Sequence, residues 1–336
     1  MRRPRLFAPL LAAIVAGAVV AGISLASGST STGPAATGTV AGVALQGSFV
    51  NVVHSVSPSV VQIEDQTGLG SGIVFDSRGD IVTNNHVVSG GKSFTVTTST
   101  GKRYPAKLVG AFPPDDLAVV SVSGAGLKPA AFADSSTLLV GDLAIAIGNP
   151  LGLRSSVTEG IVSAFRQAVQ EEGNVTLPSV IQTIAAIYPG NSGGALVDIE
   201  GRVIGIPTLA ATDPQLGGGS APGIGFAIPS NLVQDIAGQI VVHGKVIDSH
   251  RAYLGIAVGQ TTNGVYVASV KAGGPAAKTM HVGDVIVAVA GKPTPATALL
   301  SAALAELKPG RSIAVTVMRN GRRTTLRVTL GVYPGG

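Results

Sequence analysis

The sequence predicts a mainly β fold, in which a large β part is followed by a smaller α+β unit. Glycine is abundant, with 46 residues among 336, and the many valines and isoleucines suit short strands joined by tight turns. After Arg251 the pattern changes, because short strands there flank one apolar helical stretch. A chain of this length can form two or three compact units.

The N-terminus predicts an export segment. A basic start, Met-Arg-Arg-Pro-Arg, precedes an uncharged apolar run from Leu6 to Ala26, which is about the length that crosses a bilayer. Length favours a single-pass membrane anchor with its N-terminus inside, whereas Ser24-Leu-Ala26 would suit a cleaved signal peptide. Both alternatives place the rest of the chain outside the cytoplasmic membrane. Residues 27–45, rich in Ser, Thr, Gly, Pro and Ala, predict a flexible linker.

A histidine stands at the end of a predicted strand. Residues 70–88 read as a strand, an Arg-Gly turn and a second strand that ends near His86. Rigid scaffold at this point would hold a catalytic side chain well. His86 is therefore a candidate catalytic base.

Two adjacent carboxylates follow the histidine along the chain. Pro113 and Pro114 end one segment, and an apolar strand begins directly after Asp115 and Asp116. Either aspartate could orient a histidine base. Position alone leaves both as candidates.

A serine lies on a tight glycine-flanked turn in residues 188–196, just before an apolar strand. A serine hydroxyl is a poor nucleophile near neutral pH, so it needs a base to take its proton and a third group to orient that base. Backbone amides at the turn could stabilise the oxyanion, and Gly190 permits dihedral angles that a side chain would forbid. Ser192 is thus the candidate nucleophile, and the amides of Gly190 and Ser192 are the candidate oxyanion donors.

The three motifs resemble the HtrA (DegP-like) family of trypsin-fold serine proteases. They read Thr83-Asn-Asn-His-Val-Val88, Asp116-Leu-Ala-Val119 and Gly190-Asn-Ser-Gly-Gly194, in the family's order. The resemblance covers most of residues 46–230 and implies a catalytic triad of His86, Asp116 and Ser192, with Asp116 preferred over Asp115.

The resemblance also implies a chymotrypsin-like double β-barrel with the site in the cleft between the barrels. We expect one barrel from about Phe49 to Ser135 and the other from about Thr137 to Pro229. The family likeness further implies an ATP-independent endopeptidase that degrades or processes unfolded or misfolded envelope proteins in protein quality control and stress response. A homotrimer is the implied assembly.

The chain departs from the family pattern near the nucleophile. Ile184 stands where an acid is common and Tyr188 where an asparagine is common, while Pro207 removes a backbone donor. No carboxylate lies in residues 185–187 or 206–209, where the specificity pocket is expected. An aliphatic residue before the scissile bond is therefore predicted.

The C-terminal part resembles a PDZ domain. The likeness rests on Tyr253-Leu-Gly-Ile256 as the carboxylate-binding loop, on Gly283-Asp-Val-Ile286 and on an apolar helix over residues 296–307. Strands are predicted over residues 264–270 and 284–290, and Asn320-Gly321 predicts a hairpin between residues 312–319 and 322–329. The resemblance implies capture of hydrophobic C-terminal peptides, with the carboxylate held by the amides of Leu254, Gly255 and Ile256. A small packing domain without a ligand is the simpler alternative.

These readings divide the chain into an export segment at residues 1–26, a linker at 27–45, a protease domain at 46–243 and a PDZ domain at 244–336. A helix from Asn231 to His243 would close the protease domain, with Ser230 or Asn231 as its N-cap and Gly244 at its C-terminal end.

Other classes of function fit poorly. Three of the 23 basic residues precede the apolar run, so the rest of the chain is nearly neutral, and we expect no nucleic-acid partner. The histidines lie scattered, which predicts no metal site and no cofactor; they are His54, His86, His243, His250 and His281. Two alternatives to the protease remain open. One is a catalytically latent chaperone, and the other is a peptide sensor that depends on the PDZ domain.

Overall fold

The computed structural model describes residues 37–66, 68–149, 156–170, 175–188, 190–213, 219–262 and 264–335. The predicted export segment lies outside these ranges. Within them, no helix combines the length and the apolar character needed to cross a bilayer.

The first helix, α1 (Thr37–Val56), takes in part of the predicted linker, so the prediction of a flexible tether up to residue 45 is wrong from Thr37 onward. Composition was misleading here, because the segment after Pro34 has no further proline before Pro58. Near the end of α1, Val52 and Val56 are buried in the main core. Packing of these side chains stabilises the end of the helix beyond its modest intrinsic propensity.

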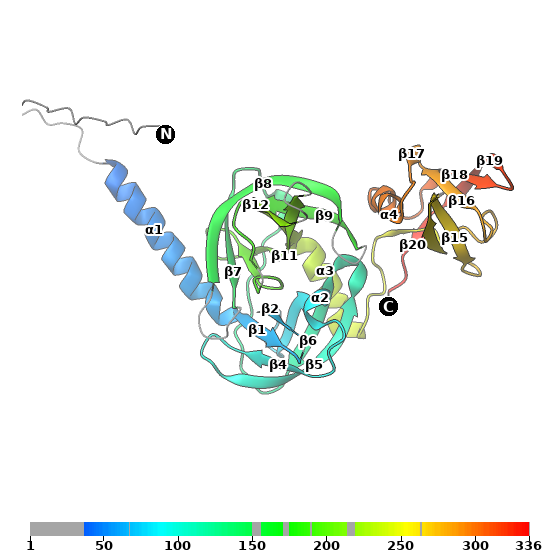
Figure 1. The fold of residues 1–336 in the computed structure, drawn as a ribbon. Coiled ribbons are helices and arrows are strands. Elements are labelled where there is room, and N and C mark those ends of the chain that lie inside the picture. Colours follow the sequence, from blue (N-terminus) through cyan, green and yellow to red (C-terminus); the bar gives the residue numbers. More distant parts are fainter. Residues whose placement is uncertain are drawn as a thin grey trace, which may run out of the picture. The chain divides into compact units, whose positions relative to one another are not determined.

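Six antiparallel strands form the first closed barrel, in the order β1-β2-β3-β6-β5-β4 (Figure 1). They are β1 (Val60–Glu64), β2 (Leu69–Val74), β3 (Asp80–Asn84), β4 (Phe94–Thr97), β5 (Arg103–Phe112) and β6 (Leu117–Val122). Short helical turns stand between them: η1 (Ser57–Ser59), α2 (Asn85–Val88) and η2 (Pro113–Asp115). The barrel begins at Val60 and not at Phe49 as predicted, because Phe49 belongs to α1.

A second closed barrel follows, in the order β10-β11-β12-β9-β8-β7. Its strands are β7 (Leu143–Gly148), β8 (Ser156–Gln170), β9 (Thr176–Thr183), β10 (Ala195–Val197), β11 (Val203–Asp213) and β12 (Gly219–Pro229), with η3 (Ser135–Thr137) before them. The predicted double β-barrel is thereby confirmed.

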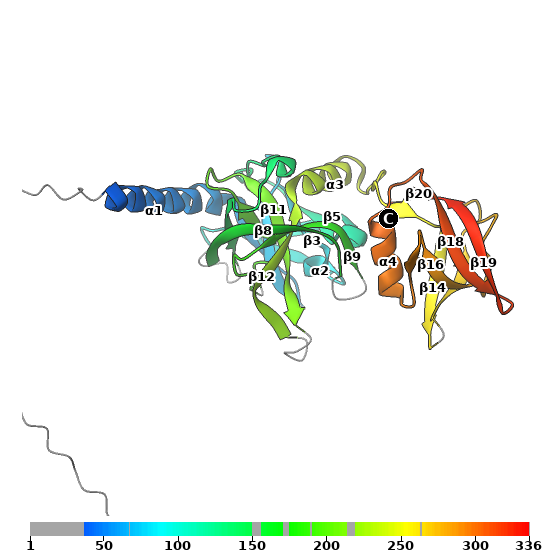
Figure 2. The same ribbon diagram turned by 90° about the horizontal axis from the view of Figure 1, so that it is seen from above.

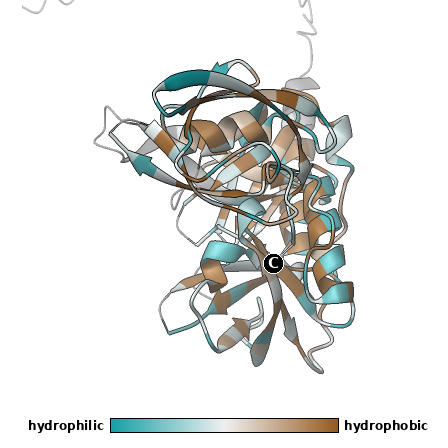
Figure 3. Ribbon diagram, turned by 90° about the vertical axis from the view of Figure 1, so that its right-hand side faces the viewer, coloured by the Kyte–Doolittle hydropathy of each residue, from teal (hydrophilic) through white to brown (hydrophobic). Residues whose placement is uncertain are grey.

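Strand β7 buries both of its faces, which explains its near-continuous apolar sequence. Along β7, Ala144 and Ala146 face the interior of the second barrel, while Ile145 and Ile147 join a cluster shared by both barrels. This is the period of two that a strand imposes on its side chains. Brown and paler segments succeed one another along the ribbons in Figure 3. Each large aliphatic side chain buried in this way stabilises the fold by about 1.5–3 kcal/mol.

Helix α3 (Ser230–His243) closes the double barrel and buries Val233, Ile236 and Ile240 in the shared cluster. Gly244 ends it in the left-handed region, with φ of 72°, as predicted. The predicted N-cap is wrong, because Pro229 holds that position. The Ser230 hydroxyl instead donates to the carbonyl of Ala133.

The C-terminal domain contains a sheet in the order β14-β15-β16-β18-β19, with β17 on β16, and a separate two-stranded sheet of β13 and β20. Its elements are β13 (Ala252–Tyr253), β14 (Ile256–Thr261), β15 (Gly264–Val270), β16 (Val285–Val289), β17 (Lys292–Pro293), α4 (Thr297–Ala305), β18 (Ser312–Arg319), β19 (Arg322–Thr329) and β20 (Gly331–Val332). Figure 2 shows α4 beside β14 and β16. These bounds confirm the predicted strands, helix and hairpin to within two residues.

The hairpin turn between β18 and β19 has positive φ at both central residues, 50° at Asn320 and 76° at Gly321. A two-residue turn of this kind matches the right-handed twist of the strands that it joins. The α+β domain has its own core, separate from that of the barrels, which includes Val265, Ile286 and Val315.

Candidate active site

His86 and Asp116 face each other at one end of the first barrel. The histidine lies in α2, directly after β3, and its Nδ1 is 2.8 Å from Asp116 Oδ2. The His86 main-chain N–H also donates to Asp116 Oδ1 at 2.9 Å. The Asp116 side chain is 4% exposed and that of His86 is 49% exposed. A buried carboxylate therefore orients a histidine whose other face reaches solvent.

The backbone turns sharply to present this aspartate. Asp116 follows η2 with φ of 49°, a left-handed conformation that is uncommon for residues other than glycine. Its carbonyl accepts hydrogen bonds from the Asn84 side chain at 3.1 Å and from the Asn85 N–H at 3.0 Å. The end of β3 thus fixes the carboxylate and the histidine in one unit.

The second barrel contributes Thr208 and Ser192. The Thr208 hydroxyl donates to Asp116 Oδ2 at 2.7 Å, and the Thr208 carbonyl accepts from Ser192 Oγ at 3.1 Å. The sequence analysis did not identify Thr208. A hydroxyl has one proton, so in this conformation the proton of Ser192 is directed to that carbonyl.

The nucleophile turn is closed by the Asn191 N–H, which donates to the Tyr188 carbonyl at 3.0 Å. Gly190 has φ of 95°, a backbone conformation that glycine adopts without steric cost. The carbonyls of Gly190 and Ser192 both accept hydrogen bonds from Ser71 of β2. Ser71 is a second residue to which the sequence analysis gave no role.

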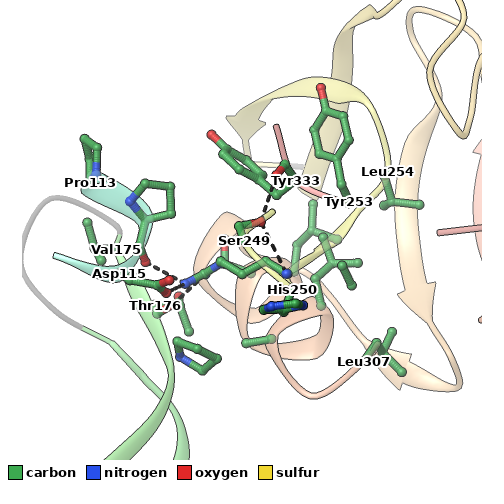
Figure 4. Close-up of a pocket in the computed structure, with 18 of the residues that line it drawn as sticks. Pro113, Asp115, Val175, Thr176, Ser249, His250, Tyr253, Leu254, Leu307 and Tyr333 are labelled. Atoms are coloured by element: carbon green, nitrogen blue, oxygen red, sulfur yellow. Dashed lines mark hydrogen bonds and ion pairs between the residues drawn. The ribbon is translucent and has the colours of Figure 1, made fainter. Parts of the chain in front are cut away.

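Asp115, the competing aspartate, has a different partner. Its side chain is fully buried and forms an ion pair with Arg251, which also donates to the carbonyl of Thr176 at 2.8 Å. Asp115 and Thr176 also line the cavity drawn in Figure 4, which is lined as well by the loop from Tyr253 to Ile256. Burial raises the pKa of the Asp115 carboxyl, and the positive charge of Arg251 opposes part of that rise.

The predicted specificity segment is apolar. Ala185 is fully buried, and a Cβ added to Gly225 would lie 2.4 Å from the side chain of Ile187. Ile184 and Tyr188, two departures from the family pattern, have exposed side chains. The carbonyl of Pro207, the third departure, accepts a hydrogen bond from the Gly193 N–H at 3.0 Å.

The predicted peptide-binding loop, Tyr253 to Ile256, lines a cavity of about 480 Å3. Leu300 and Leu304 of α4 line the same cavity, and Figure 4 labels Tyr253 and Leu254 beside it. The Leu254 side chain itself is buried in the core of the domain. Gly255 takes φ of 76°, which suits a loop that must turn its amides inward.

In the part of the chain that the structure describes, His, Asp and Glu side chains do not gather into a group that could hold a metal ion.

Two family models match the chain. One, described as the trypsin-like peptidase domain, matches residues 70–206. The other, described as the PDZ domain, matches residues 252–330. His86, Asp116 and Ser192 fall within the first match and Tyr253 to Ile256 within the second, while Thr208 lies two residues beyond the first.

Named relatives cover most of the chain. The periplasmic pH-dependent serine endoprotease DegQ of Escherichia coli (strain K12) is 39% identical over 279 residues, which is 78% of this chain and 59% of DegQ. The serine protease Do-like HtrA of Lactococcus lactis subsp. cremoris (strain MG1363) is 40% identical over 78% of this chain and 70% of its own length. The chain thus spans little more than half of DegQ.

A solved structure shares the fold. The HtrA-type protease AlgW with decapeptide superposes with a TM-score of 0.59 at 32% sequence identity, covering 85% of this chain and 99% of AlgW. The serine endoprotease from Yersinia pestis gives a TM-score of 0.58 at 34% identity, over 85% of this chain and 98% of its own.

Proposed function

We propose, from the premise that this chain belongs to the HtrA family of trypsin-fold serine proteases, that it is an ATP-independent serine endopeptidase. The observation that carries the proposal is the His86 Nδ1 to Asp116 Oδ2 contact of 2.8 Å, joined to Ser192 through Thr208. These contacts unite a candidate base, its orienting carboxylate and a candidate nucleophile from two barrels.

In this mechanism Asp116 accepts the Nδ1–H of His86, so the lone pair that acts as the base is on Nε2. Ser192 turns its hydroxyl proton from the Thr208 carbonyl to His86, gives it up and attacks the scissile carbonyl. The protonated histidine then gives that proton to the leaving amine. Water then attacks the acyl-enzyme, giving its proton to His86, and His86 returns that proton to Ser192 as the acyl group leaves.

The amides of Gly190 and Ser192 would receive the charge that develops on the carbonyl oxygen. The positive φ of Gly190 supports this role, because it fixes the direction of the turn before substrate arrives. Donors fixed in advance stabilise the transition state without reorganising during the reaction.

The substrates we propose are unfolded or misfolded proteins of the cell envelope. The apolar surroundings of Ala185 and Ile187 favour an aliphatic residue before the scissile bond. The apolar cavity at Tyr253 to Ile256 suits the hydrophobic C-terminus of a peptide, and AlgW, a structural neighbour, was solved with a decapeptide.

We further propose an extracytoplasmic location and a homotrimeric assembly. DegQ and the DegP-like relative of Pseudomonas putida (strain W619) are named periplasmic endoproteases, which supports the location. Leu6 to Ala26 would direct export, either as a cleaved signal or as a retained anchor. Nucleic acid is not among the proposed partners.

A latent form is the second candidate function. It is favoured by the Ser192 hydroxyl, whose proton is directed to the Thr208 carbonyl in this conformation. In such a form the chain would bind unfolded proteins or peptides and cleave them only after a conformational change.

A fluorophosphonate probe tests the proposal, because it reacts with an activated serine. The 336-residue chain and Ser192→Ala would be labelled in parallel and then incubated with unfolded casein, with and without peptides that end in a hydrophobic residue. Labelling and cleavage confined to the parent would support the endopeptidase. A parent that neither reacts nor cleaves in any condition would favour the latent form.

A further inference from the structure

We infer that Ser71 is a positioning residue for the oxyanion hole, an inference that rests on the proposed protease function. Ser71 lies within β2 of the first barrel and is fully buried. The nucleophile turn leads directly into β10 of the second barrel. A single residue of one barrel therefore holds the catalytic turn of the other.

Two hydrogen bonds from Ser71 reach the two residues whose amides would bind the oxyanion. Its main-chain N–H donates to the Ser192 carbonyl at 2.8 Å, and its hydroxyl donates to the Gly190 carbonyl at 2.6 Å. The backbone has only φ and ψ as soft dihedral angles. Holding a carbonyl at each of these residues limits the rotations by which their amides could leave the hole.

The direction of the Ser71 hydroxyl proton is determined by its neighbours. The main-chain N–H of Asn149, directly after β7, donates to Ser71 Oγ at 2.8 Å. An amide can only donate, so the proton of the hydroxyl must point to the Gly190 carbonyl. The Ser71 hydroxyl therefore donates its hydrogen bond to the nucleophile turn.

The remaining polar atom of Ser71 ties the turn to the strand before the histidine. The Ser71 carbonyl accepts from the Thr83 hydroxyl at 2.7 Å, and Thr83 lies in β3, three residues before His86. Gly193 packs against the same place, because an added Cβ would lie 2.1 Å from the Ser71 oxygen. The turn, Ser71 and the strand that leads to the histidine therefore form one connected unit.

Another buried polar side chain of the turn does not share this task. The side-chain amide of Asn191 is buried, and its nitrogen and oxygen make no hydrogen bond among the described residues. The side-chain bond that holds the turn to the other barrel thus comes from Ser71 and not from Asn191.

Ser71→Ala should lower kcat by about 10- to 100-fold, less than the ~10²–10³-fold cost of deleting an oxyanion donor outright. KM should change little, because substrate binding does not use the charge that forms on the carbonyl oxygen. The affinity for a peptide aldehyde, which forms a tetrahedral adduct, should fall with kcat. Active sites would be counted by fluorophosphonate titration so that the loss is measured per folded molecule.

Ser230→Ala is the matched control. Ser230 is also fully buried, and its hydroxyl donates to a distant main-chain carbonyl, that of Ala133, at 2.7 Å. This control should lose a similar amount of stability and keep the kcat of the parent. A second test variant, Thr83→Val, keeps the side-chain shape, removes the donor to the Ser71 carbonyl and should lower kcat by a smaller factor.

Hydrogen exchange of the amides of Gly190 to Gly194 completes the experiment, because it needs no turnover. Exchange should accelerate in Ser71→Ala and not in Ser230→Ala. If Ser71→Ala and Thr83→Val keep the parent's kcat, aldehyde affinity and exchange rates, the inference is wrong even when the parent is an active protease. A parent without labelling or turnover would overturn the proposed function alone, and the exchange rates would still decide the role of Ser71.

Discussion

Thr208 and His86 bind the same oxygen atom of Asp116, although they come from different barrels. The Thr208 hydroxyl lies 2.7 Å and His86 Nδ1 lies 2.8 Å from Asp116 Oδ2. Two donors on one buried carboxylate oxygen fix its orientation.

Thr208→Val should therefore lower kcat/KM by about 10- to 100-fold, the equivalent of a hydrogen bond to a charged group worth ~1.5–3 kcal/mol. Valine keeps the shape of threonine and leaves the Thr208 carbonyl in place. Steady-state hydrolysis of a peptide substrate would measure the change. Thr294→Val, at a buried threonine of the C-terminal domain, should have no effect on kcat/KM; equal losses in the two variants would contradict the role given to Thr208.

Arg251→Met should destabilise the protein by about 3–5 kcal/mol at neutral pH, because it leaves the Asp115 carboxylate buried without its cation. Unfolding in urea, followed by circular dichroism, would give the free energy of unfolding. The double variant with Asp115→Asn should recover part of the loss, which a double-mutant cycle would quantify.

The loss caused by Arg251→Met should shrink in acid. Burial raises the pKa of Asp115 in the folded state, so the folded protein binds this proton at a pH where the unfolded chain has released it. Stability linked to such a group is present at low pH and is lost as pH rises through the folded-state pKa. A deficit that is the same at pH 4 and pH 7 would argue against ionised Asp115 as its source.

Asp284→Asn should show the opposite dependence on pH. Hydrogen bonds from Arg319, two of 2.7 Å, lower the pKa of the Asp284 carboxyl below its usual value of about 3.9. The stabilisation is therefore complete above that value and is lost as pH falls through the folded-state pKa. Calorimetry should find a loss of about 1.5–3 kcal/mol at pH 7 that disappears in strong acid; a loss that persists there would mean that charge is not involved.

Leu304→Asp should weaken binding of a peptide with a free hydrophobic C-terminus by at least about tenfold, because it puts a charge into the apolar groove. Fluorescence polarisation of a labelled peptide would measure Kd. Leu299→Asp is the control, since Leu299 is exposed on the same helix and does not line the groove. An amidated peptide should bind the parent weakly, and equal binding of both peptides would exclude carboxylate capture.

Local sequence patterns predicted the strands and the candidate catalytic residues. The Asn320-Gly321 turn, the strand that ends before His86 and the glycines around Ser192 are all readable within about ten residues. The two barrels were expected only from the resemblance to the HtrA family.

The partners of those residues were not predictable, because they depend on how distant strands meet. Thr208 is 92 residues from Asp116, Gly190 is 119 residues from Ser71, and Arg251 is 136 residues from Asp115. Composition also misassigned the start of α1, whose other end is buried in a core built from distant strands.

Because the site is divided between two barrels, the turnover rate depends strongly on the position of one barrel relative to the other. Val119 of one barrel and Ile145 and Ile206 of the other pack in the shared cluster. A misplacement of about 1 Å can cost on the order of a hundredfold in rate. Replacing any of these side chains by a smaller one should therefore abolish turnover at temperatures where circular dichroism still shows that both barrels are folded.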